Sequence, residues 1–202
     1  MRLLRKFRNK IKHRSHIKRI FASNNIHIAQ CDIDRIVFNI SGNNNDITIG
    51  KLDGCACGKI YLNITGENNH VNIGAGLIIG SRLDIIIGQA HPNFGPVSNV
   101  DCNIGKNTSI ESCTITTYNS NAKISIGPDC MFSSNVNLFQ TDAHAILDAS
   151  GNIINKVKSL EIEKHVWLGA NVTILKNTHI PMNSIVGWGA VVCGNFMGGG
   201  GG

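Results

Sequence analysis

Apolar residues recur at every sixth position along the C-terminal part of the chain. In IEKHVWLGANVTILKNTHIPMNSIVGWGAVV, aliphatic residues stand at Ile162, Leu168, Ile174, Ile180, Val186 and Val192. Four places after each of the first five come small or β-branched residues, at Val166, Val172, Thr178, Ser184 and Ala190. A period of six fits neither an amphipathic helix nor an alternating sheet. It predicts a triangular β-helix, in which each hexapeptide forms one flat side and three sides complete a coil of about 18 residues.

A second regularity lies in the N-terminal half. The stretch NISGNNNDITIG at 39–50 returns as NITGENNHVNIG at 63–74. Each copy reads as a strand, a tight turn and another strand, because Asn and Gly tolerate the left-handed backbone angles of a corner. Weaker hexads at 104–115 and 126–131 extend the solenoid, so we expect it to cover about residues 35–195. A right-handed solenoid in the N-terminal half remains an alternative.

The hexads are interrupted once, between Leu138 and Ile162, by FQTDAHAILDASGNIINKVKS. A solenoid has no packing need for such a loop, and extruded loops are common places for function. The loop contains one histidine, His144, the residue type best suited to act as a general base near neutral pH. We therefore predict one extruded active-site loop, at 139–161.

The hexads, the central loop with its histidine and Trp167 in HVWLG together make the chain resemble the hexapeptide-repeat acyltransferases. Within them it looks most like the bacterial capsule and O-antigen polysaccharide O-acetyltransferases. The resemblance implies an all-β fold, a left-handed parallel β-helix, and acetyl-CoA-dependent transfer to a hydroxyl of a surface glycan or its precursor. It also implies a homotrimer with active sites between subunits, and no metal.

The same resemblance assigns roles to individual residues. It makes His144 the general base, with Asp142 either orienting the imidazole or capping a turn. Trp167 is expected to face outward and to wall a pocket for the pantetheine arm or the sugar, since an indole does not fit the narrow interior. Backbone amides near Gly169 and Ala170 are expected to line the channel for the coenzyme A arm.

Three further residues are weaker candidates, each with a competing interpretation. Asn135 either contacts the acceptor or turns a corner, and Lys176 either meets a coenzyme A phosphate or is a solvated turn lysine. Trp188 stands where related enzymes commonly carry a small residue, so it either obstructs the nucleotide end of the cofactor site or stacks on adenine.

Charge is concentrated at the N-terminus. Nine of the 19 Lys and Arg residues lie in the first 20 positions, which contain no acid, so the remainder has 10 basic and 13 acidic residues and a net charge of −3. This balance argues against nucleic-acid binding by the body. Residues 1–21 read as a basic amphipathic helix that either caps the solenoid or contacts an anionic membrane surface. No segment resembles a signal peptide or membrane span, so we expect a cytoplasmic protein, either free or at the inner face of the membrane.

The cysteines and histidines do not suggest a metal site. The seven cysteines include no pair of CxxC motifs, and most are expected to be small buried side chains. His144, His165 and His179 lack the close pair that a zinc hydratase on this scaffold would need. We divide the chain into the helix at 1–21, the β-helix domain at 22–196 and a Gly-rich tail at 197–202.

Two functions compete with the O-acetyltransferase. An amino-sugar nucleotide N-acetyltransferase would use the same base and cofactor. A catalytically decayed scaffold is the third interpretation, because CGNF and five glycines follow VGWGAVV where related enzymes have a Pro-containing tail over the cofactor.

Overall fold

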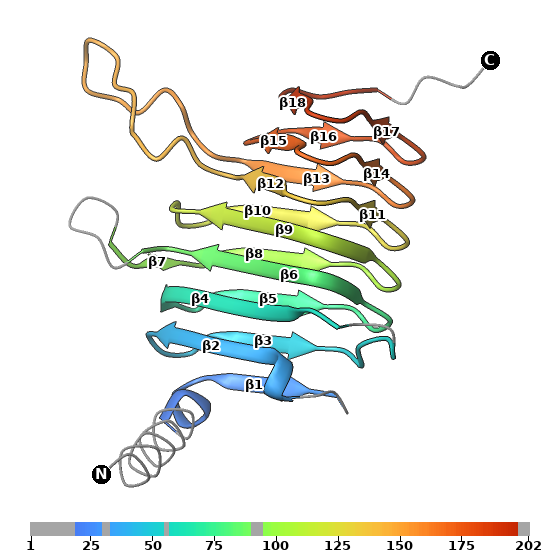
Figure 1. Ribbon diagram of the computed structural model, residues 1–202. Coiled ribbons are helices and arrows are strands. Elements are labelled where there is room, and N and C mark those ends of the chain that lie inside the picture. Colours follow the sequence, from blue (N-terminus) through green and yellow to red (C-terminus); the bar gives the residue numbers. More distant parts are fainter. Residues whose placement is uncertain (1–18, 30–32, 55–56, 90–94, 198–202) are drawn as a thin grey trace, which may run out of the picture.

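The chain winds into a stack of coils, each of which pairs with the coils before and after it (Figure 1). This computed structural model describes residues 19–29, 33–54, 57–89 and 95–197. Residues 19–23 are helical, and η1 (Ile33–Arg35) is a single turn of 3₁₀ helix. The rest of the predicted basic helix, residues 1–18, lies outside the described residues, as does most of the Gly-rich tail. The fold is the predicted left-handed parallel β-helix throughout, and the right-handed alternative is not needed.

One flat side of the β-helix is a seven-stranded parallel sheet. It contains one short strand from each coil, so its order follows the chain. The strands are β1 (Asn25–Ile28), β3 (Asp46–Ile49), β5 (His70–Ile73), β8 (Asp101–Ile104), β10 (Lys123–Ile126), β13 (Ser159–Ile162) and β16 (His179–Ile180).

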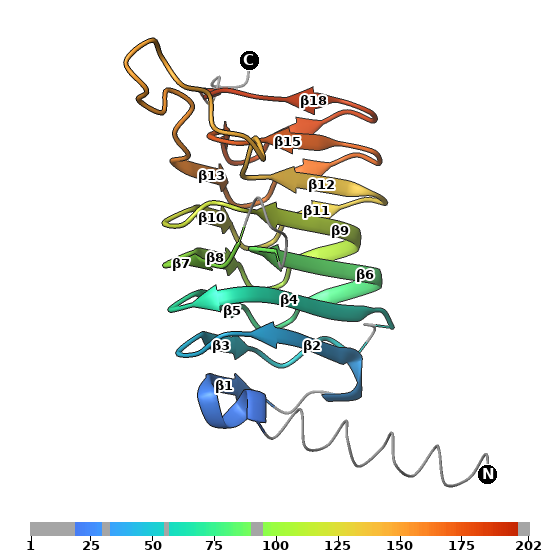
Figure 2. The same cartoon turned by 90° about the vertical axis from the view of Figure 1, so that its left-hand side faces the viewer.

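An 11-stranded sheet forms the remaining two sides (Figure 2). In the middle coils, β6 (Ile78–Ile87) and β9 (Ser109–Thr117) run across both sides, whereas in the C-terminal coils a turn divides each coil into two short strands. The long strands and their short partner are β2 (Ile36–Ser41), β4 (Lys59–Glu67), β6 (Ile78–Ile87), β7 (Val97–Ser98) and β9 (Ser109–Thr117). The short strands are β11 (Met131–Phe132), β12 (Val136–Phe139), β14 (Trp167–Leu168), β15 (Thr173–Leu175), β17 (Ile185–Val186) and β18 (Val191–Val192).

The hexad positions fill the interior as predicted. Ile162, Leu168, Ile174 and Ile180 are at most 2% exposed. Val186 and Val192 are only partly buried, because no described coil covers them from above. Leu168 pairs with Val186 one coil later, so the C-terminal coils have the expected length of 18 residues.

The repeated N-terminal segments stack directly on each other. Asn39 pairs with Asn63 and Asp46 with His70, a separation of 24 residues. Two adjacent asparagines in each copy have different tasks. Asn44 and Asn68 take left-handed backbone angles at the corner, with φ of 57° and 56°. The next residue of each copy turns its side chain into the interior.

These inward-pointing side chains form a ladder of Asn24, Asn45 and Asn69. Asn45 Nδ2 donates to Asn24 Oδ1 over 2.8 Å, and Asn69 Nδ2 donates to Asn45 Oδ1 over 3.0 Å. Asn69 Oδ1 then accepts the amide of Val100. The ladder satisfies backbone groups at a corner where no water enters, as buried polar groups require.

The cysteines follow the prediction only in part. Cys102, Cys113 and Cys130 are buried interior side chains, whereas Cys57 and Cys193 are exposed. The two exposed thiols lie in turns outside the packed strands. Cys31 and Cys55 fall outside the described residues.

Candidate active site

The extruded loop leaves the β-helix after β12 and returns at β13 (Figures 1 and 2). It projects from one corner of the stack, near the C-terminal end. This is the interruption predicted at 139–161, and the structure gives it as residues 140–158.

The outer part of the loop is a small hairpin. Leu147 and Ile153 form an antiparallel bridge, and the amide of Ile154 donates to the carbonyl of Ile146 over 2.9 Å. Asp148 holds the turn, because its Oδ1 accepts the amides of Ser150 and Asn152. These bonds, the amide of Asn152 first, lower the pKa of Asp148. The hairpin therefore has its own internal order, although four of its large apolar side chains are exposed: Ile146, Leu147, Ile153 and Ile154.

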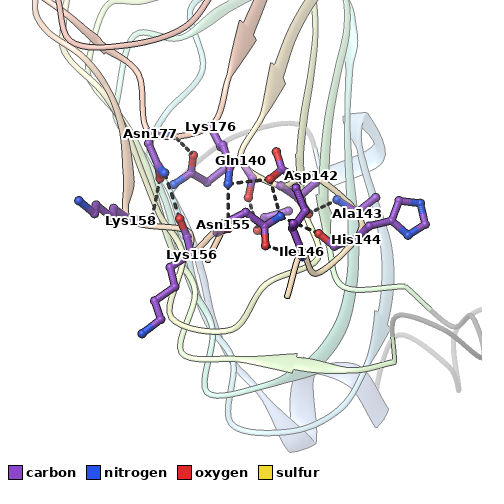
Figure 3. Close-up of polar contacts among 12 residues, drawn as sticks. Gln140, Asp142, Ala143, His144, Ile146, Asn155, Lys156, Lys158, Lys176 and Asn177 are labelled. Carbon is purple, nitrogen blue, oxygen red and sulfur yellow. Dashed lines mark hydrogen bonds and ion pairs between the residues drawn. The ribbon is translucent and has the colours of Figure 1, made fainter. Parts of the chain in front are cut away.

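His144 lies at the base of this hairpin and its side chain is exposed. The preceding residue, Ala143, has a φ of 60°, a left-handed angle that is unfavourable for a residue with a Cβ. Figure 3 shows the imidazole pointing out from the loop, away from the cluster of polar side chains at its base. An imidazole so placed can meet a hydroxyl supplied from outside the chain.

Asp142 belongs to that polar cluster. Its Oδ2 is 2.6 Å from Lys176 Nζ and accepts a hydrogen bond from Asn155 Nδ2 over 2.7 Å (Figure 3). Partial burial raises the pKa of Asp142, but the bonds from Lys176 and Asn155 outweigh it, so the pKa is lowered overall. In this structure Asp142 holds the loop, and its role in orienting the imidazole stays a prediction.

Lys176 is not a solvated turn lysine, and its contact with a coenzyme A phosphate stays a prediction. Its side chain is 17% exposed, and its ammonium also donates to the carbonyl of Asn155 over 2.8 Å. A phosphate would have to displace Asp142 to reach it. Lys176 instead joins the loop to the coil above.

Asn177 and Gln140 complete the attachment of the loop. Asn177 Nδ2 donates to the carbonyl of Lys156, and Asn177 Oδ1 accepts the amide of Lys158. The amide of Asn177 donates to Oε1 of the buried Gln140 over 3.0 Å. Both ends of the loop are thus bonded to the corner after β15.

Trp167 faces outward as predicted, with 46% of its surface exposed. It stands in register between Met131 and Ile185, which are also exposed, and its Nε1 lies 3.4 Å from Ser133 Oγ. These side chains line an open groove of about 860 Å³ with His165 and Asn183. The lining of the groove is mostly apolar, as is common for ligand pockets.

Trp188 and the predicted amide channel lie at the next corner. Trp188 is 77% exposed, directly after β17. The amide of Gly169 donates to the carbonyl of Val186 over 2.8 Å, and the carbonyl of Ala170 accepts the amide of Gly189. The Gly169 amide is therefore used within the β-helix, and the amide channel near Gly169 and Ala170 stays a prediction.

Asn135 serves the corner rather than an open acceptor pocket. Its φ is 56°, and its Nδ2 donates to Asn171 Oδ1 over 2.8 Å. The corner interpretation of this residue is the one that the geometry supports.

The structure does not bring Trp167 and His144 together within one chain. β15 and a corner separate Trp167 from the base of the loop, and no loop residue lines the tryptophan groove. Figure 1 shows the loop and β14 at opposite sides of the stack. A site that contains both residues therefore needs a second copy of the chain.

In the described ranges no three His, Cys, Asp or Glu side chains are placed to hold a metal ion. His179 bonds Glu163 and the carbonyl of Phe196, and His165 bonds Asn183.

Among the described residues no helix is long and apolar enough to cross a bilayer.

Asn155, Asn177 and Gln140 are the residues that sequence reasoning missed. All three act through amide side chains that bond backbone groups distant in sequence. The only sequence signal is their position, at the two ends of the loop and directly after the strand above it.

Comparison with known proteins supports the predicted resemblance, although no family model matches the chain. A polysialic acid O-acetyltransferase from Neisseria meningitidis is 38% identical over 102 residues, which cover 48% of this chain and 47% of that protein. A polysialic acid O-acetyltransferase from Escherichia coli O1:K1 is 43% identical over 54 residues, covering 26% of this chain and 18% of that protein. The matched region spans less than half the length of either relative.

Solved structures agree over more of the chain. The polySia-specific acetyltransferase NeuO superposes with a TM-score of 0.57 and 25% identity, covering 80% of this chain and 79% of that one. The polysialic acid O-acetyltransferase OatWY gives a TM-score of 0.53 and 27% identity, covering 86% and 77%. The predicted fold and the resemblance to capsule O-acetyltransferases are confirmed by these likenesses.

Proposed function

We propose that the chain is an O-acetyltransferase that moves an acetyl group from acetyl-CoA to a hydroxyl of a bacterial capsule polysaccharide. The agreement of sequence and structure with polysialic acid O-acetyltransferases carries this proposal. Polysialic acid is accordingly the first acceptor to test, with other capsule and O-antigen glycans after it.

In this proposal His144 is the general base. Its neutral imidazole takes the proton of the acceptor hydroxyl while the oxygen attacks the thioester carbonyl. The C–S bond then breaks, and the imidazolium returns the proton to the thiolate, so that free coenzyme A and the acetyl ester leave. General-base assistance of this kind is worth about 10²–10⁴-fold in rate.

The groove around Trp167 is the proposed place for the acetyl-CoA arm. Its outward indole and the flanking Met131 and Ile185 offer apolar contact to the pantetheine chain. We propose that the exposed Trp188 stacks on adenine.

A homotrimer would bring the Trp167 groove of one copy and His144 of another into one site. Because Trp167 and His144 lie at different corners, the loop of one copy must approach the groove of another to form one site. Apolar side chains are exposed on both partners, the hairpin tip on one and the row of Met131, Trp167 and Ile185 on the other. Contact between them would cover apolar surface that is otherwise exposed.

We place the protein in the cytoplasm, where acetyl-CoA is made. The basic residues 1–21 would then be able to contact the anionic inner face of the membrane.

The proposal is tested by release of free thiol from acetyl-CoA with polysialic acid and a panel of other glycans. Native protein and His144→Ala are compared, and His70→Ala on the outer face of β5 serves as a matched control. Glycan-dependent release that is lost only in His144→Ala supports an O-acetyltransferase. Transfer to amino-sugar nucleotides alone would support the N-acetyltransferase instead. No transfer and no acetyl-CoA binding would indicate a decayed scaffold.

The shared site is tested separately by mixing inactive variants. His144→Ala and Trp167→Ala copies are unfolded together and refolded, so that mixed oligomers form. Recovered activity supports a site built from two copies, whereas activity that never exceeds the sum of the two pure variants contradicts it.

A further inference from the structure

The side chain of Asn155 contacts every second residue of the segment around His144, at positions 142, 144 and 146. Its Nδ2 donates to Asp142 Oδ2 over 2.7 Å and to the carbonyl of His144 over 2.8 Å. Its Oδ1 accepts the amide of Ile146 over 2.8 Å. Figure 3 shows this carboxamide between the two limbs of the loop.

The two backbone bonds have the pattern of a strand pair. In an extended segment, the carbonyl of one residue and the amide two residues later point to the same side. The Asn155 carboxamide meets that pair as the N–H and the C=O of one residue in a neighbouring strand would. The hairpin already has a bond from the amide of Ile154 to the carbonyl of Ile146. The Asn155 carboxamide continues this hydrogen bonding as far as the carbonyl of His144.

Asn155 and Asp142 are in turn attached to the β-helix. Lys176 Nζ bonds both the carbonyl of Asn155 and the carboxylate of Asp142, and the lysine is largely buried. Asn177, its neighbour, holds Lys156 and Lys158 on the returning limb. The backbone of His144 is thus linked to the rigid corner after β15 through two side chains.

The backbone before His144 needs such support. Ala143 adopts a left-handed angle, which is unfavourable for a residue with a Cβ. The amide of Ala143 is held by Thr141 Oγ1 over 3.0 Å on one side, and Asn155 holds the next residue on the other. Without Asn155 the segment would be free to relax to an ordinary extended angle and swing the imidazole away.

We infer that Asn155 is the positioning residue of the site: it sets the backbone that presents His144 without itself touching substrate. This inference rests on the proposed function for its effect on catalysis. Its structural half, the order of residues 142–146, does not depend on any activity.

The test compares Asn155→Ala with Asn152→Ala. Asn152 lies in the same loop and its carboxamide also bonds an aspartate, Asp148, but at the hairpin tip. A third variant, Asn155→Asp, keeps an oxygen for the amide of Ile146 and loses both donated bonds. The melting temperature of each variant shows whether the β-helix itself is intact.

Two readouts separate the outcomes. Hydrogen exchange at the Ile146 amide is expected to rise at least tenfold in Asn155→Ala and to stay near the native rate in Asn152→Ala. If the protein transfers acetyl groups, kcat is expected to fall about 10²-fold in Asn155→Ala and Asn155→Asp, with KM for acetyl-CoA within about twofold, because misplacing a base by about 1 Å has that effect.

Equal exchange and equal kcat in Asn155→Ala and Asn152→Ala would overturn the inference. A raised KM with an unchanged kcat, and therefore a lowered kcat/KM, would also overturn it, since that result would place Asn155 in substrate binding. If native protein transfers nothing, the proposed function fails, and the Ile146 exchange rate alone still decides whether Asn155 orders the loop.

Discussion

Replacing Asn69 by Ala tests the reason why the chain repeats its Asn pair. Asn69 is fully buried, and its side chain makes three hydrogen bonds: Nδ2 donates to Asn45 Oδ1 and to the carbonyl of Val97, and Oδ1 accepts the amide of Val100. The alanine leaves the Val100 amide without this acceptor in the interior. Stability should fall sharply because no water can replace the lost groups.

The magnitude follows from these three bonds. An unpaired buried amide costs about 1–3 kcal/mol, and each of the other two bonds contributes about 1 kcal/mol, so we expect a loss of about 3–5 kcal/mol. Whole domains are stable by about 5–15 kcal/mol, so the loss is a large fraction of the total. In a solenoid, where each coil contacts its neighbours, the loss should concentrate in the coils from Asn45 to Val100.

Urea unfolding and amide exchange measure the effect. Asn63→Ala is the matched control, because Asn63 lies six residues away and accepts one bond, from the surface-facing Asn39, which should be worth under about 0.5 kcal/mol. A change below about 1 kcal/mol in Asn69→Ala at an unchanged m-value, or an effect equal to that of Asn63→Ala, would refute the reasoning.

Two other predictions concern titrating groups. Burial raises the pKa of the Cys102 thiol to about 12, so iodoacetamide at pH 8 should modify exposed Cys57 in the native protein and Cys102 only in urea; modification of both at one rate would contradict the structure. The bond to Glu163 raises the pKa of His179 above 6.5, and both ring nitrogens face acceptors, Glu163 Oε1 and the carbonyl of Phe196. The protonated ring satisfies both, so this stabilisation is present below pH 6.5 and lost as pH rises through the raised pKa. Amide exchange at the C-terminal edge, divided by the intrinsic rate at each pH, should therefore rise over that range in native protein, and His179→Gln should remove this rise.

The interior of the fold was predictable because its period is local. Ile162, Leu168, Ile174 and Ile180 each fill the same position in successive sides, so a count along the sequence identifies them without knowledge of any contact. The same count placed the interruption between Leu138 and Ile162 correctly. The Asn pairs were recognised as corners, but one member of each pair turns inward, and a turn residue and a ladder residue look identical in a sequence.

The site was less predictable because it depends on which corner each residue reaches. Trp167 and the loop are near in sequence, yet β15 lies between them in space. Lys176 looked free to meet a phosphate, but the loop folds back to bond it. The partners of Asp142 come from 13 and 34 positions later, and no local pattern indicates such pairs.

Acetyl transfer to polysialic acid is the most direct measurement of the central claim. Acetyl-CoA labelled with ¹³C in its acetyl group is incubated with polysialic acid and protein, and the polymer is examined by NMR for a new ester. Native protein and His70→Ala are expected to produce labelled O-acetyl groups, and His144→Ala to produce at least about 10²-fold fewer. Unlabelled polymer with native protein, or equal labelling by His144→Ala, would contradict the proposed acetyl transfer to this acceptor or the role of His144 in it.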